Sequence, residues 1–239
     1  MSESTESTFR RLAIEAPVII ASILLAFAID AWWQESEERE AEIVMLKRLQ
    51  ADFIELDKSL QVVEEEHGWA KEACQFFMNQ PLGSTLEINP DNDRKVFLVF
   101  LASRTFNPGS GAVASFHNND GGRLIQNQTL ADKILAWSGL VEELQEEETN
   151  LQKGVAERWS PFIASRVSIG PYMGIVDFEN ELPAQIKMPV NRKPLILDEE
   201  FINHVLDRYK WQQIAIRDIK PVRKSVEDIL VLIAIELDG

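Results

Sequence analysis

Apolar residues form one nearly unbroken block close to the N-terminus of the 239-residue chain. The block runs from Leu12 to Trp33, roughly 22 residues, and an α-helix needs ~20 to cross a bilayer. Glu15 and Asp30 bracket its most apolar part, where charges lie near lipid headgroups. Trp32, beside Trp33, is typical of an aromatic belt at the membrane interface. The pattern predicts a transmembrane helix over 12–33, after a tail of residues 1–11.

Charges on the two sides of this block predict its orientation. Arg10 and Arg11 precede it, whereas glutamates dominate just after it, with only Arg39 against them. Because basic residues stay on the cytoplasmic side, we expect a cytoplasmic N-terminus. In a bacterium this places the protein in the inner membrane, with residues 34–239 in the periplasm.

Two other interpretations of the block remain open. A cleaved signal peptide would end near a small-residue site, and Ala26-Phe27-Ala28 offers one. However, the apolar sequence continues past that point to Trp33. A buried helix of a soluble protein is the other alternative, and we favour the uncleaved anchor over both.

After the block, apolar residues recur at alternating steps of three and four, which predicts two long helices over 35–79 and 198–238. The first seam comprises Leu46, Leu49, Phe53, Leu56, Leu60, Val63, His67, Ala70, Cys74 and Phe77. The second comprises Ile202, Val205, Tyr209, Gln212, Ile216, Ile219, Arg223, Val226, Leu230, Ile233 and Leu237. Asp198 is the expected N-cap of the second helix. Each seam needs a partner, so we expect an antiparallel pair within one chain; a parallel homodimeric coiled coil is the alternative.

Three polar residues interrupt the seams. His67 lies on the first, and Gln212 and Arg223 lie on the second. Polar residues at such positions can fix the register between helices, so these are the predicted interhelical polar positions. Pro221 is expected to kink or split the second helix.

The remaining middle region, 84–197, is expected to be small and helical. Residues 129–153 predict one helix with a broad apolar face, and the glutamates at 142, 143 and 146–148 predict its solvated side. Residues 170–194 are punctuated by proline and show no clear element. The fold class is therefore mostly α, with a transmembrane helix that continues into a long helical hairpin.

Composition removes several classes of function. The net charge of −15 argues against nucleic acid as a partner, because phosphates need lysine and arginine. A single cysteine, Cys74, excludes an intramolecular disulfide. The three histidines are far apart in sequence, and no catalytic motif is recognisable. We therefore predict no catalytic residue, no metal ligand and no cofactor, and expect that the protein is not an enzyme.

Two stretches carry a family resemblance. LLAFAIDAWWQESEEREAEIVMLKRLQADF has an apolar segment ending in an acidic residue and tryptophan, then Leu46, Leu49 and Asp52 in a Leu-x-x-Leu-x-x-Asp pattern. GGRLIQNQTLADKILAW (121–137) is similar to the middle of the same family. The chain thus resembles an uncharacterised family of bacterial single-pass membrane proteins. The resemblance implies membrane anchoring and a helical periplasmic domain, and no known activity.

These observations support three hypotheses. The first is a non-catalytic accessory or scaffold subunit of an inner-membrane complex, with lipid and an integral membrane protein, or further copies of the chain, as partners. Its first contacts would be Asp30, Trp32 and Trp33. The second is a ligand-binding or sensory periplasmic domain, with a site near Phe100, Phe106 and Trp137. An enzyme of unrecognised type is the third and the least favoured.

Overall fold

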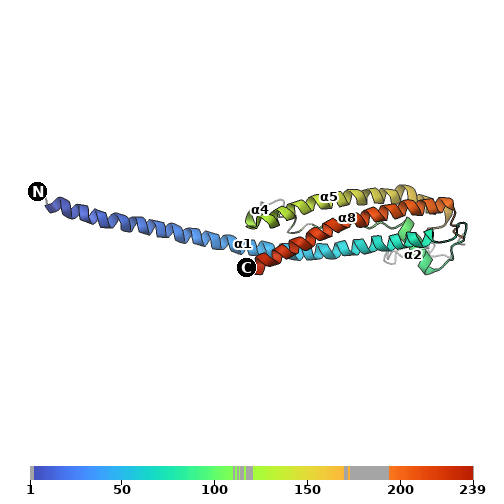
Figure 1. Ribbon diagram of the computed structural model, residues 1–239, viewed down its shortest axis with the longest axis horizontal. Coiled ribbons are helices and arrows are strands. Elements are labelled where there is room, and N and C mark those ends of the chain that lie inside the picture. The colour runs from blue at the N-terminus through green and yellow to red at the C-terminus, as the bar shows by residue number, and fades with distance from the viewer. Residues whose placement is uncertain are drawn as a thin grey trace, which may run out of the picture.

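The computed structural model describes residues 3–109, 111, 113, 116, 121–169, 172 and 194–238, with side chains from residue 19 onward except 121 and 123. Its longest element is α1 (Glu3–Met78), a single helix of 76 residues. At 1.5 Å per residue this helix is about 114 Å long. Figure 1 shows that its N-terminal half extends alone, while its C-terminal half packs against other helices.

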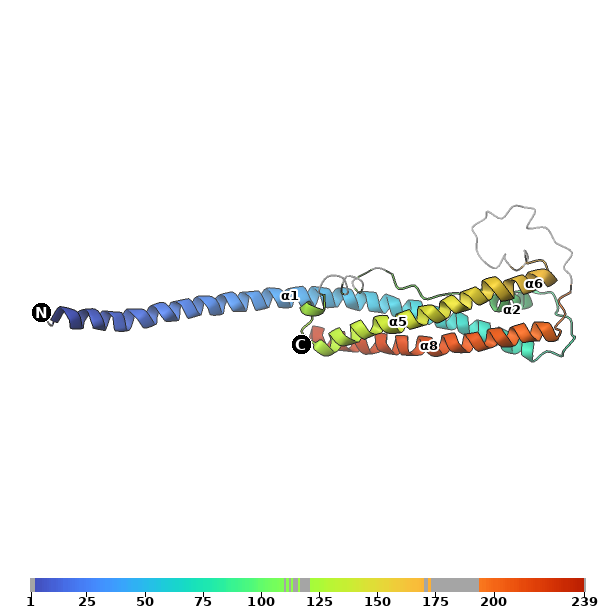
Figure 2. The ribbon, with the colours of Figure 1, turned by 90° about the horizontal axis from the view of Figure 1, so that it is seen from above.

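The packed half of α1 belongs to a three-helix bundle. The C-terminal helix α8 (Glu199–Asp238) runs antiparallel to it, which confirms the expected pairing within one chain. The third member, α5 (Gln128–Gly154), runs in the same direction as α1 and packs mainly against α8 (Figure 2). A five-residue π-helical segment, η1 (Val155–Trp159), joins α5 to α6 (Ser160–Arg166).

The buried face of α1 follows the predicted seam closely, since Leu56 alone of its ten positions is only partly buried. The buried face of α8 differs from its predicted seam. Val205, Gln212, Ile219, Val226 and Ile233 are buried as expected. At the alternate positions the buried residue comes one place earlier: Phe201, Arg208, Ala215, Val222 and Ile229. Arg223 consequently lies at the margin of the interface instead of inside it.

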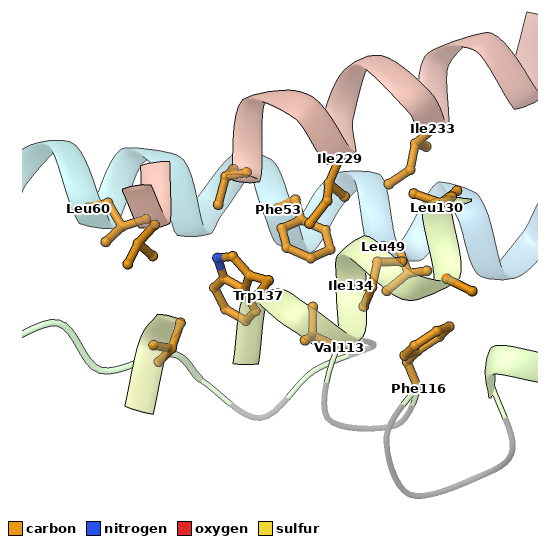
Figure 3. Close-up of a cluster of buried hydrophobic side chains, with 14 of the residues drawn as sticks. Leu49, Phe53, Leu60, Val113, Phe116, Leu130, Ile134, Trp137, Ile229 and Ile233 are labelled. Atoms are coloured by element: carbon orange, nitrogen blue, oxygen red, sulfur yellow. The ribbon is translucent and has the colours of Figure 1, made fainter. Parts of the chain in front are cut away.

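Buried apolar residues form two clusters along the bundle. The first lies at the end near the free half of α1 and joins residues such as Leu49, Phe53, Trp137 and Ile229 (Figure 3). Within it, the rings of Phe53 and Trp137 meet edge to face, with centroids 5.3 Å apart. The second cluster fills the distal end with Phe77, Phe100, Trp159, Phe162 and Phe201.

Short elements close the two ends. The short helix α2 (Pro90–Phe100) packs against α1 at the distal end, and α4 (Gly121–Leu124) lies beside α1 near the other end. Distally, the chain leaves α1 through a turn in which Gly83 has φ +81°, a conformation that favours glycine. An isolated β-bridge then pairs Thr85 with Ile196.

Local sequence determines where the helices start and whether they continue. Asp198 accepts a hydrogen bond from the Phe201 amide at 2.9 Å, which confirms it as the N-cap of α8. Asn127 caps α5 in the same way, through the Leu130 amide. Of the two expected effects of Pro221, the split does not occur, because α8 continues through this residue without interruption. Of the proline-rich segment 170–194, only 172 and 194 lie within the described residues.

Candidate functional site

The most distinctive surface is the apolar segment of α1 outside the bundle. Among the described residues, one helix is long and apolar enough to cross a membrane, and its most apolar 18-residue window has mean hydropathy 1.2. No part of that window is buried. The large apolar side chains from Ile19 to Ile29 are 49–67% exposed. A continuous apolar surface of this length marks a region that contacts lipid or another protein.

The predicted interface residues lie where this segment ends. Trp32 and Trp33 are 65% and 61% exposed. The Trp33 indole Nε1 donates a hydrogen bond to Glu37 one turn later, at 2.9 Å. Asp30 is also exposed and lies less than one turn before the two tryptophans on the same helix. The side chain of Glu15 lies outside the described residues.

The bundle begins about two and a half turns beyond Trp33, at a polar junction around Glu42 that the apolar seam did not include. Glu42 is fully buried and forms an ion pair with Arg39 at 2.6 Å. Its other oxygen accepts the Gln126 amide, also at 2.6 Å. Arg39 also donates to the main-chain carbonyl of Glu236, whose carboxylate accepts from the Asn127 side chain. One turn of α1 therefore holds both the start of α5 and the end of α8.

A sequence signal for this junction existed. Glu42 lies four residues before Leu46, so it continues the α1 seam by one position. Because its side chain is acidic, a seam defined by apolar residues does not include it. A buried carboxylate with an arginine partner is costly to leave unpaired, so the junction specifies where the three helices meet.

A second group of buried polar residues, separate from the junction at Glu42, crosses the bundle between the two apolar clusters. We call this group the second polar layer. The His67 Nδ1 atom lies 2.6 Å from the Gln212 side-chain amide, which joins two of the predicted polar positions. The hydrogen-bonding pattern places the amide nitrogen toward His67 and the oxygen toward Arg208, 2.9 and 3.0 Å from Nη2 and Nε. Burial lowers the pKa of His67 to about 4, so this imidazole is neutral at pH 7.

The third predicted polar position forms a separate contact between α1 and α8. Arg223 donates to Glu64 at 2.7 Å and to Asp57 at 3.3 Å. All three side chains keep 26–32% of their surface exposed, so solvent screens the pair. Arg223 thus adds to helix register at the edge of the interface, apart from the layer of His67 and Gln212.

Arg208, which the sequence analysis did not single out, is the central residue of the second polar layer. It is 1% exposed, and its Nη2 donates to the carbonyl of Ala102 in the segment after α2. Its guanidinium also lies over the Trp159 ring, 4.6 Å from the centroid. The π-helical turn places that tryptophan, and such turns occur frequently at functional sites.

The α5 helix carries another buried acid, Glu148. Both of its carboxylate oxygens lie 2.9 Å from the Phe106 amide nitrogen, which donates to them. Burial raises the pKa of Glu148 to about 7, and the amide only partly opposes that rise. This carboxyl group therefore titrates near neutral pH, unlike an exposed glutamate.

The aromatic ligand site expected near Phe100, Phe106 and Trp137 does not form as one site. Phe106 and Trp137 belong to the cluster near the free half of α1, whereas Phe100 packs in the distal cluster. A cavity of about 210 Å³ does lie beside Trp137, between Asp52 and Leu56 of α1 and neighbouring loop residues. It is smaller than the ~300–1,000 Å³ of typical ligand pockets.

Neither a metal site nor a similarity to known proteins assigns a function to the chain. Among the described residues, no group of three or more histidine, cysteine, aspartate or glutamate side chains could hold a metal ion. No protein-family model, curated protein or solved structure matches the chain.

Proposed function

We propose that this chain is a single-pass, membrane-anchored, non-catalytic accessory or scaffold subunit of a bacterial inner-membrane complex. The observation that carries the proposal is the exposed apolar half of α1, which leaves the bundle without a break in the helix. A helix of this kind needs lipid around it. The N-terminus is cytoplasmic and the bundle is periplasmic, following the arginines before the segment and the glutamates after it.

The shape of the bundle supports a scaffold role. Two apolar clusters extend along its length, and its helices are joined by polar contacts at the junction of Glu42 and in the layer of His67. A rod of this kind holds a partner at a fixed distance from the membrane. The partner is an integral membrane protein, met through Asp30, Trp32 and Trp33 beside the bilayer surface.

Co-purification tests the partner. We would tag the C-terminus, extract membranes in mild detergent and identify bound proteins by mass spectrometry. A reproducible, stoichiometric partner with transmembrane helices is expected. Recovery of this chain alone, as monomer or homodimer, would overturn the subunit proposal and direct attention to ligands of the bundle.

Two variants separate partner contact from general stability. Asp30→Asn removes a charge at the end of the apolar segment, and we expect it to reduce recovery of the partner at least several-fold. Glu38→Gln removes a charge from the exposed stretch beyond it, two turns away, and should leave recovery unchanged. Equal recovery with both variants would show that Asp30 does not contact the partner.

Anchoring and orientation need their own measurement. The intact mass of the purified chain should include residues 1–33, whereas a mass beginning near Leu25 to Asp30 would identify a cleaved signal peptide. A C-terminal alkaline phosphatase fusion should be active and a C-terminal cytoplasmic fluorescent reporter dark. The reverse pattern would place the bundle in the cytoplasm.

A further inference from the structure

Within the described part of the chain, the second polar layer contains a buried positive charge without a buried negative one. The polar partners of the Arg208 guanidinium are the Ala102 carbonyl and the Gln212 side-chain oxygen, and its ring partner is Trp159; all three are neutral. Its Nη1 atom is buried and has no hydrogen-bond partner among the described residues. Burial lowers the pKa of Arg208 to about 10, so the group still carries its proton at neutral pH.

The two acidic groups that act on this charge do not neutralise it. Asp207 is paired with Arg158 at 2.8 Å and keeps a third of its side chain exposed, so its charge is already shared and solvated. Cys74 is buried, and burial raises its pKa to about 12, which keeps it a neutral thiol. An uncompensated buried charge costs several kcal/mol. Among the residues that the structure describes, the layer thus holds no counterion for Arg208.

The layer also contains buried hydrogen-bond donors that have no acceptor among the described residues. Because the Gln212 amide nitrogen donates to His67 Nδ1, the proton of this neutral imidazole is on Nε2. That Nε2 atom and the Trp159 Nε1 atom are buried donors without an acceptor among the described residues. The hydroxyl of Ser103, next to Ala102, is also buried and unpartnered. Water could accept these bonds, but it would leave the charge of Arg208 uncompensated.

We infer that the polar layer is a binding site for a small monovalent anion of the chloride class, held at Nη1 of Arg208. The buried donors of His67, Ser103 and Trp159 belong to the same layer. The ion would sit where α1, α8, the π-helical turn and the segment after α2 meet, between the two apolar clusters. Its role is to neutralise the layer and hold these four segments together.

Chloride-dependent stability tests the site in the full-length chain in detergent. Thermal unfolding would be followed in sodium chloride and in sodium gluconate at matched ionic strength. An ion that binds only the folded state should raise Tm by about 4 °C when its concentration is tenfold above Kd. Gluconate is too large for a buried layer and should not reproduce this rise.

Arg208→Met removes the charge and should abolish the chloride dependence. Arg217→Met is the matched control, because Arg217 lies on the same helix but is exposed and paired with Asp218. It should keep the full dependence. Equal Tm rises in chloride and gluconate, or an unchanged chloride dependence in Arg208→Met, would overturn the proposal.

A direct measurement covers the case in which Arg208→Met does not fold. Crystals of the wild-type full chain grown in sodium bromide should show an anomalous peak in contact with Arg208 Nη1. Density for water alone at that position would overturn the anion site. Neither result depends on whether the chain has a membrane partner.

Discussion

The buried carboxyl group of Glu148 makes the stability of the bundle depend on pH. Its pKa is about 7 in the folded protein, against 4.5 for an ordinary glutamate. Between these values Glu148 keeps a proton in the folded protein that it releases in the unfolded chain, so its contribution to the free energy of unfolding falls as pH rises from 4.5 to 7. The total loss is about 3 kcal/mol, and stability is level with respect to this group above pH 7.

Replacing this acid by its neutral isostere tests the effect. The unfolding free energy of Glu148→Gln, measured by urea denaturation in detergent, should rise between pH 5 and pH 8 relative to that of the wild type. The fall due to Glu148 is then gone, while the opposite contribution of His67, whose pKa is lowered to about 4, remains. Glu146→Gln, two residues earlier on the exposed side, should behave as wild type. Should Glu148→Gln retain the full pH dependence, another group would be responsible.

Single buried polar residues were the least predictable part of the molecule. Glu148 lies within a run of glutamates and was assigned to the solvated side of its helix, although it shares a face with Leu144 and Leu151. The spacing of apolar residues along α8 predicts Tyr209 at the interface, whereas the buried residue is Arg208. The main-chain groups that satisfy the two, the Phe106 amide and the Ala102 carbonyl, come from one irregular segment whose position no helical period encodes.

The end of α5 depends on a close contact that a glycine permits. A Cβ atom at Gly154 would lie 2.6 Å from two ring atoms of Trp159. Gly154→Ala should therefore destabilise the bundle by about 1–3 kcal/mol through overpacking, even though alanine is the better helix former. Thermal or urea unfolding of the full chain in detergent measures this change.

The same helix offers a matched control. Gly139 is exposed, and a Cβ atom there would have nothing within 4 Å. Gly139→Ala should stabilise α5 by about 0.5–1 kcal/mol. Opposite signs for the two substitutions are expected. A stabilising Gly154→Ala would show that the Trp159 ring can move aside, and that the π-helical turn does not depend on it.

Helical periodicity predicted the elements better than their assembly. It placed α8 within one residue at each end and α5 within one residue as well. It assigned α1 and α8 to each other correctly but treated α5 as part of a small middle region. The apolar face of α5 indicates only that something covers it. At alternate positions of α8 the buried residue comes one place before the predicted one, because α8 must contact α5 as well as α1.

The described part of the molecule is elongated, because the N-terminal half of α1 extends from one end of the helical bundle. Trp33 and Met78 are 45 residues apart on one helix, so at 1.5 Å per residue the distal end stands about 68 Å from the proposed bilayer surface. Residues 34–41, almost all exposed, link the exposed apolar segment to the first buried residue, Glu42. The orientation of the bundle relative to the membrane therefore depends on the continuity of these two turns of helix.

Glu38→Pro should break that continuity without harming the bundle. Proline at position 38 removes the main-chain hydrogen bond to Gln34 and clashes with the preceding turn, at a local cost of about 3 kcal/mol. In lipid nanodiscs, electron microscopy of the wild type should show a narrow distribution of angles between the bundle axis and the disc. The proline variant should show a broad one, with Tm within about 2 °C of wild type because no bundle contact is lost.

Glu38→Ala should match the wild type in both respects. Equally broad angles for all three proteins would contradict a rigid link. A scaffold with a flexible link at this position could not hold its partner at a fixed height.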